Sequence, residues 1–201
     1  MDSAIIIAKL QKYIGEDRIA HTVGVYESAR WLGSILLPER LEELSVAALL
    51  HDIAKELSKE ELLDLIRSST GDLTEEDLAT APALHSFAGA VLAQRDFSEY
   101  VNDDILSAIY NHTLGTAEMS LFDKIIFISD YIEEGRRAKE CKAVRDYLAL
   151  ALENDDRNNI KSLDMAIVMS IEFTEEYIRE KGFRMNSRSV KFKNSILEKY
   201  K

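Results

Sequence analysis

Apolar residues recur at helical spacing along almost the whole chain, and this periodicity limits the fold more than any other feature of the sequence. Only 2 prolines and 8 glycines occur among the 201 residues, so few positions interrupt a helix. Hydrophobic residues make up 46% of the chain, which is enough for a large core. With no alternating strand pattern in view, the sequence predicts an all-α fold in a single domain spanning residues 1–201.

Local start and stop signals divide this domain into helices. Asp17 is the expected N-cap of the second helix, Ser58 with Glu61 forms a capping-box pattern, and Thr74 with Asp77 offers a weaker one. The expected helices cover residues 4–13, 18–37, 39–50, 59–67, a segment after Pro82 that contains His85, 102–110, an apolar segment around Asp130 within 119–137, 138–153, 159–181, and a last one from Ser187.

The net charge of -11 argues against general nucleic-acid binding. The charge is uneven, because residues 181–201 contain 7 Lys or Arg and one Glu. This basic end has two interpretations: a solvated last helix, or a cationic tail that folds back toward an anionic ligand or a partner subunit.

Composition also indicates in which cellular compartment the protein is expected. A single cysteine, Cys141, excludes an intramolecular disulfide and a CxxC motif. Residues 1–13 lack a basic leader, and no stretch approaches the ~20 apolar residues of a membrane span. We therefore expect a soluble cytoplasmic protein without a membrane partner.

The dipeptide His51-Asp52 closes the apolar segment LSVAALLHDIAK, residues 44–55. Burial of an imidazole beside a carboxylate costs free energy, and a bound cation commonly offsets that cost. The structural alternative is that His51 bonds to a backbone carbonyl and Asp52 caps the next helix.

Asp130 raises the same question, since it lies in a strongly apolar segment. Either an arginine such as Arg136 satisfies it, or it is a metal ligand. Together with His21 on the second helix, the HD pair and Asp130 form a mixed nitrogen and oxygen set that suits Fe, Mn, Co or Zn better than Mg.

Three further residues could complete a site. A helical turn would place Lys55 on the same side as the HD pair, where it could contact phosphate. His85 and His112 could bind a second metal, contact phosphate oxygens or protonate a leaving group.

The order His21, His51-Asp52, Asp130 resembles the H…HD…D pattern of the HD superfamily of metal-dependent phosphohydrolases. The chain is most similar to its YqeK family, through RIAHTVGVYESARWLG, AALLHDIAKELS, LHSFAGAVLA, IYNHTLG and DKIIFISDYIEEGRR. The resemblance extends from about Arg18 to Arg137. It implies an HD-type helical bundle with a core over about residues 17–137 and C-terminal helices, residues 138–201, packed on it. It leaves a homodimer open.

The resemblance also implies an activity, the symmetrical cleavage of diadenosine tetraphosphate into two ADP with iron as the metal, in one or two ions. A metal-bound hydroxide would attack the phosphate chain. The implied metal ligands are His21, His51, Asp52 and Asp130. Lys55, His85, His112 and Arg136 would contact phosphate, with Asp52, Lys55, His85 and His112 as the catalytic set and Arg18 as a nucleotide contact.

The C-terminal segment departs from the family pattern. An Arg-Asn pair is expected there, and this chain has Lys193-Asn194. Two alternatives to the implied activity stay open: an HD nucleotidase or phosphodiesterase acting on another nucleotide, and a non-catalytic module that binds a nucleotide.

Overall fold

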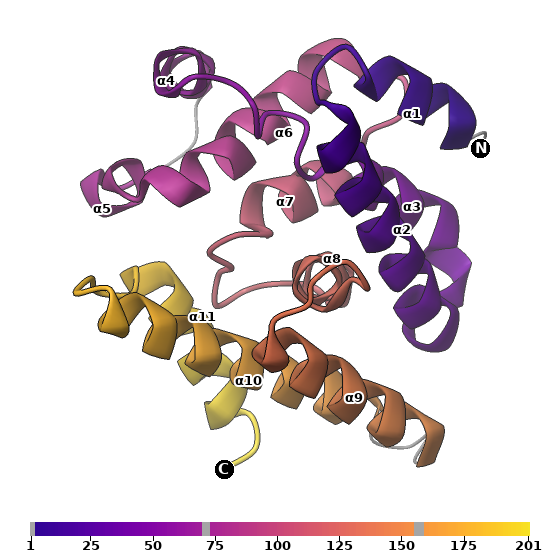
Figure 1. Cartoon of the computed structure of the whole chain (residues 1–201), viewed down its shortest axis with the longest axis vertical. Coiled ribbons are helices and arrows are strands. Elements are labelled where there is room, and N and C mark those ends of the chain that lie inside the picture. The colour runs from indigo at the N-terminus through magenta and orange to yellow at the C-terminus, as the bar shows by residue number, and fades with distance from the viewer. Residues whose placement is uncertain (1–2, 70–72, 155–158) are drawn as a thin grey trace.

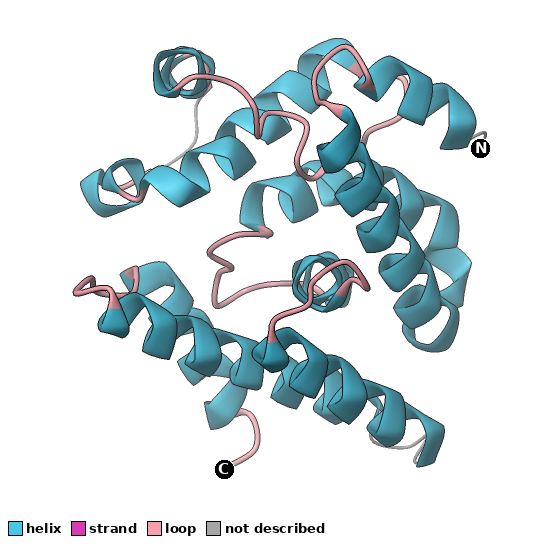
Figure 2. Ribbon diagram, viewed as in Figure 1, coloured by secondary structure: helices cyan, strands magenta, loops and turns pink. Residues whose placement is uncertain are grey.

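A computed structural model describes residues 3–69, 73–154 and 159–201. Throughout these ranges the chain forms helices and loops and no strands (Figure 2). The predicted all-α class is confirmed. No helix among the described residues is long and apolar enough to cross a membrane.

The helices follow one another through short connections (Figure 1). In chain order they are α1 (Ser3–Leu10), α2 (Glu16–Leu36), the 3-10 turn η1 (Pro38–Arg40), α3 (Leu41–Leu50), α4 (Lys59–Arg67), α5 (Glu75–Ala79), the 3-10 turn η2 (Ala81–Ala83), α6 (Leu84–Asp96), α7 (Asp103–Asn111), α8 (Leu121–Ile132), α9 (Lys139–Asn154), α10 (Asn159–Glu180) and α11 (Ser187–Glu198).

Helix starts follow the sequence signals with one exception. Both predicted capping boxes are complete, at Ser58 and at Thr74. The expected N-cap at Asp17 is wrong, because α2 begins at Glu16, two residues earlier than expected, and uses Gly15 as its N-cap. The Gly15 amide instead donates to Glu56 Oε2 at 3.0 Å, and Asp17 lies in the first turn of the helix, where a negative charge favours the helix dipole.

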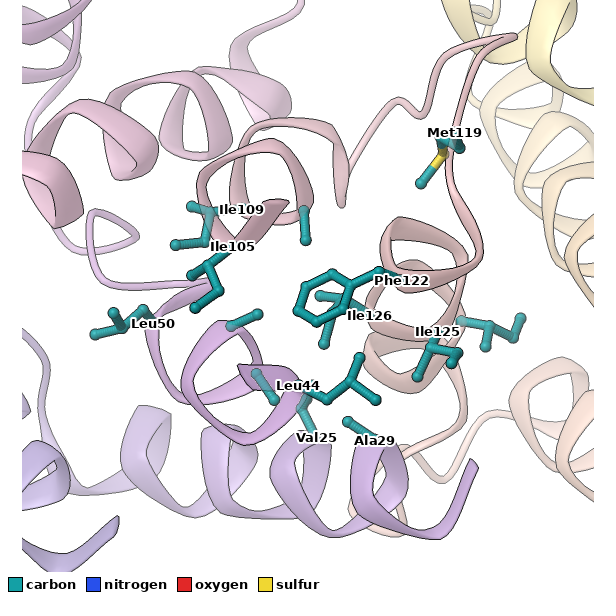
Figure 3. Close-up of a cluster of buried hydrophobic side chains, with 14 of the residues drawn as sticks. Val25, Ala29, Leu44, Leu50, Ile105, Ile109, Met119, Phe122, Ile125 and Ile126 are labelled. Carbon is teal, nitrogen blue, oxygen red and sulfur yellow. The ribbon is translucent and has the colours of Figure 1, made fainter. Parts of the chain in front are cut away.

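The core lies between α2, α3, α7 and α8. Val25, Leu44, Ile109 and Phe122 are almost completely buried and belong to one cluster of apolar side chains (Figure 3). Leu50, the last residue of α3, is part of the same cluster. Because the HD pair follows Leu50 directly, packing of α3 fixes where that pair lies.

A C-terminal layer of α9, α10 and α11 packs on the other side of α8 (Figure 1). Some cations of the basic end, among them Lys193 and Lys199, pair with acids of the same chain. Lys193 Nζ is 2.5 Å from Glu175 and Lys199 Nζ is 2.9 Å from Asp164. Gly115, with φ of 68°, allows the loop after α7 to pass under this layer, since a Cβ there would be 2.3 Å from the Phe192 ring.

Candidate metal centre

The same type of local hydrogen bond fixes the rings of His51 and His112. Each follows the last residue of a helix, α3 or α7, and each Nδ1 is 2.7 Å from the carbonyl oxygen three residues earlier, on Ala48 and Ile109. A carbonyl only accepts, so Nδ1 carries the proton and donates it. The lone pair of each ring is therefore on Nε2, which points toward Asp52.

Asp52 lies at the centre of the cluster with its two oxygens facing different partners. Oδ2 is 3.6 Å from both His21 Nε2 and His51 Nε2. Oδ1 is 3.0 Å from His85 Nε2 and 3.5 Å from His112 Nε2, and these two ring nitrogens are themselves 3.0 Å apart. One carboxylate thus faces all four histidines of the chain.

His21 comes from α2 and meets Asp130 from α8, with Nε2 at 3.1 Å from Asp130 Oδ1. Its Nδ1 is 3.2 Å from Glu133 Oε1. Glu133 is buried and also accepts from the Gly135 amide at 2.5 Å. A carboxylate behind an imidazole sets the tautomer and orientation of the ring.

The donor set fits a divalent transition metal. His51 Nε2 is buried and has no hydrogen-bond partner among the described residues. It nevertheless faces two carboxylates, at 3.6 Å to Asp52 Oδ2 and 4.0 Å to Asp130 Oδ1. An unpaired nitrogen in a polar interior costs free energy unless something fills the space between it and those oxygens. Two groups of three residues could each hold an ion, because the ligand atoms within each group all lie within 4.8 Å of one another. The first group is His21, His51 and Asp130, and the second is His51, Asp52 and His112.

The protonation states of His51, Asp52 and Asp130 agree with this fit. At His21, burial would lower the pKa of the ring, but Asp130, Asp52 and Glu133 outweigh burial and raise that pKa, so a metal there would displace a proton. Burial, together with the neighbouring His112, lowers the pKa of His51 to about 4, so its ring is neutral at neutral pH. Burial alone would raise the pKa of Asp52, but His51, His112 and His85 hold it well below its usual range. The Asp130 carboxyl is lowered in pKa in the same way by His21 and Arg136. Neutral imidazoles beside ionised carboxylates are the forms that bind metals.

Three cations surround these carboxylates. Lys55 Nζ is 3.0 Å from His85 Nε2 and 3.6 Å from Asp52 Oδ1, and Arg18 Nη1 is 2.9 Å from Asp52 Oδ2. Arg136 donates to the side chain and to the carbonyl oxygen of Asp130. Lys55 and Arg136 stay about one-third exposed, so anionic groups can reach them.

A pocket of about 270 Å³, which we call the active-site pocket, opens onto the cluster. Lys55, His112, Asp130 and Arg136 line it, together with residues of α8, α10 and the region before and within α11. Fixed positive charge beside ionised carboxylates is suited to hold a metal ion and a phosphate chain at the same time.

The model of the HD domain matches residues 18–135, more than half of the chain. The chain belongs to the HD domain family. The match includes every predicted site residue except Arg136, which follows it directly. The HD resemblance read from the motifs is confirmed.

Relatives in this family are similar over most of their length. One, from Bacillus subtilis, is named symmetrical bis(5'-nucleosyl)-tetraphosphatase and is 33% identical over 88% of this chain and 87% of its own. Another of the same name, from Halalkalibacterium halodurans, is 34% identical over 68% of this chain and 71% of its own. A crystal structure described as a predicted HD superfamily hydrolase involved in NAD metabolism, from Clostridium acetobutylicum, has a TM-score of 0.85 at 31% identity and covers 99% of this chain and 98% of that one.

The structure brings every side chain predicted for the site into one cluster. Two parts of the structural alternatives also hold, since His51 bonds to a backbone carbonyl and Arg136 pairs with Asp130. Asp52 does not cap the next helix, because Ser58 does.

Sequence reasoning missed two residues of the HD site. Glu133 contacts His21, and Arg145 on α9 donates to the carbonyl oxygens of Ile132, Glu133 and Arg136 and so fixes the loop after α8. The acidic pair in DYIEEGRR was a signal for Glu133. No local pattern pointed to Arg145.

Proposed function

We propose that this chain is a metal-dependent hydrolase that cleaves diadenosine tetraphosphate symmetrically into two ADP. The names of its HD relatives, at 33–34% identity, support the substrate class. The observation that carries the metal dependence is the buried His51 Nε2, which has no hydrogen-bond partner among the described residues and faces two ionised carboxylates.

The metal ligands in this proposal are His21, His51, Asp52 and Asp130. His85 and His112 face the other oxygen of Asp52 at 3.0 and 3.5 Å, which favours a second ion over direct phosphate contacts by these two rings. Asp52, whose two oxygens face different histidines, would then help to hold both ions. The mixed nitrogen and oxygen donors suit iron, with Mn, Co or Zn as substitutes.

Bound there, the metal supplies a Lewis acid and a water of lowered pKa. The overall hydrolysis would add a water oxygen to one of the two central phosphorus atoms and break the bond from this phosphorus to the central bridging oxygen. That oxygen would leave with the second ADP, and the protons of the water would pass to solvent. Lys55 and Arg136 stabilise the charge on phosphate oxygens as it redistributes. Arg18, which donates to Asp52 Oδ2, would contact the nucleotide once it releases that carboxylate.

Anaerobic purification, elemental analysis and product analysis test metal and reaction together. We expect about two equivalents of iron per chain and ADP as the only nucleotide product from diadenosine tetraphosphate. ATP with AMP, or release of inorganic phosphate, would contradict the symmetrical reaction. One equivalent of metal would contradict the second ion and favour phosphate contacts by His85 and His112.

Asp52→Ala should lose metal and turnover together, because this carboxylate faces every proposed ligand ring. Turnover should fall to the level of a buffer blank. Asp64→Ala, which changes an exposed carboxylate on α4, is the matched control and should retain both. Full activity in a metal-free Asp52→Ala protein would refute the proposed site.

A further inference from the structure

A second cavity adjoins the active-site pocket. We call it the outer pocket: it has a volume of about 600 Å³ and lies between α8, the start of α9 and the C-terminal half of α10. Tyr131, Arg136 and Thr174 line both cavities. The two cavities therefore meet at these three side chains, and the outer one falls in the size range of ligand sites.

Charge in the outer pocket is arranged with a direction. Arg136, on the side shared with the active-site pocket, is held by Asp130 and can contact phosphate. The charged residues that line the outer pocket only are Lys139, Glu140, Glu176 and Glu180. Lys139 Nζ is 3.8 Å from Glu140 Oε1, so carboxylates outnumber cations in this part of the cavity. Carboxylates repel phosphate but accept hydrogen bonds from hydroxyl and amino groups. A nucleotide is thus favoured in one orientation, with phosphate at Arg136 and ribose and base farther out.

An aromatic surface is available at the same end. Tyr177 on α10 lines the outer pocket and is 61% exposed, and Lys181 Nζ is 5.6 Å from the centroid of its ring. Phe173 lies one turn earlier on the same helix and also lines the cavity. An exposed aromatic side chain provides a face on which a purine base can stack.

We infer that the outer pocket is a nucleoside subsite, which takes one of the two nucleosides of a dinucleoside tetraphosphate while the other half of the molecule extends through the active-site pocket. The inference rests on the proposed function. In this subsite the base would stack on Tyr177, and hydroxyl or amino groups of the nucleoside would contact Glu176 and Glu180. The phosphate chain would pass Arg136 on its way to the active-site pocket.

Two variants test this subsite without touching the metal cluster. Tyr177→Ala removes the stacking surface, and Ala138→Trp fills the cavity from an exposed position on its wall. Phe183→Ala is the matched control, because Phe183 is 72% exposed and lines neither cavity. The readouts are kcat and KM for diadenosine tetraphosphate and the inhibition constant of inorganic tetraphosphate, which has no nucleoside.

For both pocket variants we expect KM to rise about tenfold, kcat to stay within about twofold, and the inhibition constant of inorganic tetraphosphate to stay unchanged. Phe183→Ala should match the wild type in all three. The subsite would be overturned, and the proposed function left standing, by either of two results. One is a wild-type KM in both pocket variants, and the other is a rise in the inhibition constant of inorganic tetraphosphate as large as the rise in KM. A wild-type protein that does not cleave diadenosine tetraphosphate would instead overturn the proposed function on which the subsite rests.

Discussion

Glu133 orients His21 from behind, and its own position is closely determined. One carboxylate oxygen is 3.2 Å from His21 Nδ1 and the other accepts from the Gly135 amide. On the far side Gly24 leaves room for it, since a Cβ there would be 2.5 Å from Glu133 Oε2. Glu133 is thus a positioning residue for a proposed ligand rather than a ligand itself.

Glu133→Ala should weaken metal binding about 10–100-fold, because His21 loses the partner that fixes its ring. Glu133→Gln should lie in between, since the amide oxygen can still accept from Nδ1. Competition with a chromophoric chelator measures the affinity. Glu134→Ala, at the exposed neighbouring carboxylate, is the control. Equal affinities for Glu133→Ala and Glu134→Ala would exclude a positioning role.

At the scale of elements, one buried carboxylate on α10 connects the C-terminal layer to α8. Asp164 on α10 is fully buried and accepts from Lys124 of α8 at 2.7 Å and from Tyr200, beyond α11, at 2.6 Å. Burial alone would raise the pKa of Asp164, but Lys124, Tyr200 and Lys199 together hold it below its ordinary value of 3.8. The basic end is therefore bound to the body of the protein through this residue.

Asp164→Asn should lower the free energy of unfolding by about 3 kcal/mol at pH 7, because two ammonium groups lose their carboxylate. The folded pKa is depressed, so the contribution of Asp164 is complete above pH 3.8 and is lost as the pH falls through the folded pKa. The difference between wild type and variant should shrink below about pH 4. Urea unfolding at several pH values measures it. Asp146→Asn, on the exposed face of α9, should show no such difference.

At the scale of the whole molecule, separate helices converge on the cluster of four histidines, Asp52 and Asp130. Its side chains come from α2, the turn after α3, α6, the end of α7, and α8. Helices far apart in sequence converge on it, and the carboxylates of Asp52 and Asp130 are compensated there by Arg18, Lys55 and Arg136.

Removal of metal should therefore destabilise the entire fold. Free metal at about 100 times its dissociation constant would stabilise the native state by about 2.7 kcal/mol. A chelator should lower Tm in the wild type and leave Tm of Asp52→Ala unchanged, as thermal unfolding followed by circular dichroism would show. An equal Tm shift in both proteins would mean that the metal acts elsewhere.

Local chemistry determined much of this protein from the sequence alone. Helical periodicity predicted the all-α class. Both capping boxes could be predicted because each depends only on two residues that are three positions apart. Asp17 failed as an N-cap because Gly15 is held by Glu56, a residue from another part of the chain. The other features that the sequence did not predict also depend on contacts between distant parts of the chain. Which carboxylate faces which ring, the support of His21 by Glu133, and the outer pocket depend on how distant helices pack. Only the tertiary structure decided these contacts, since no spacing along the chain encodes them.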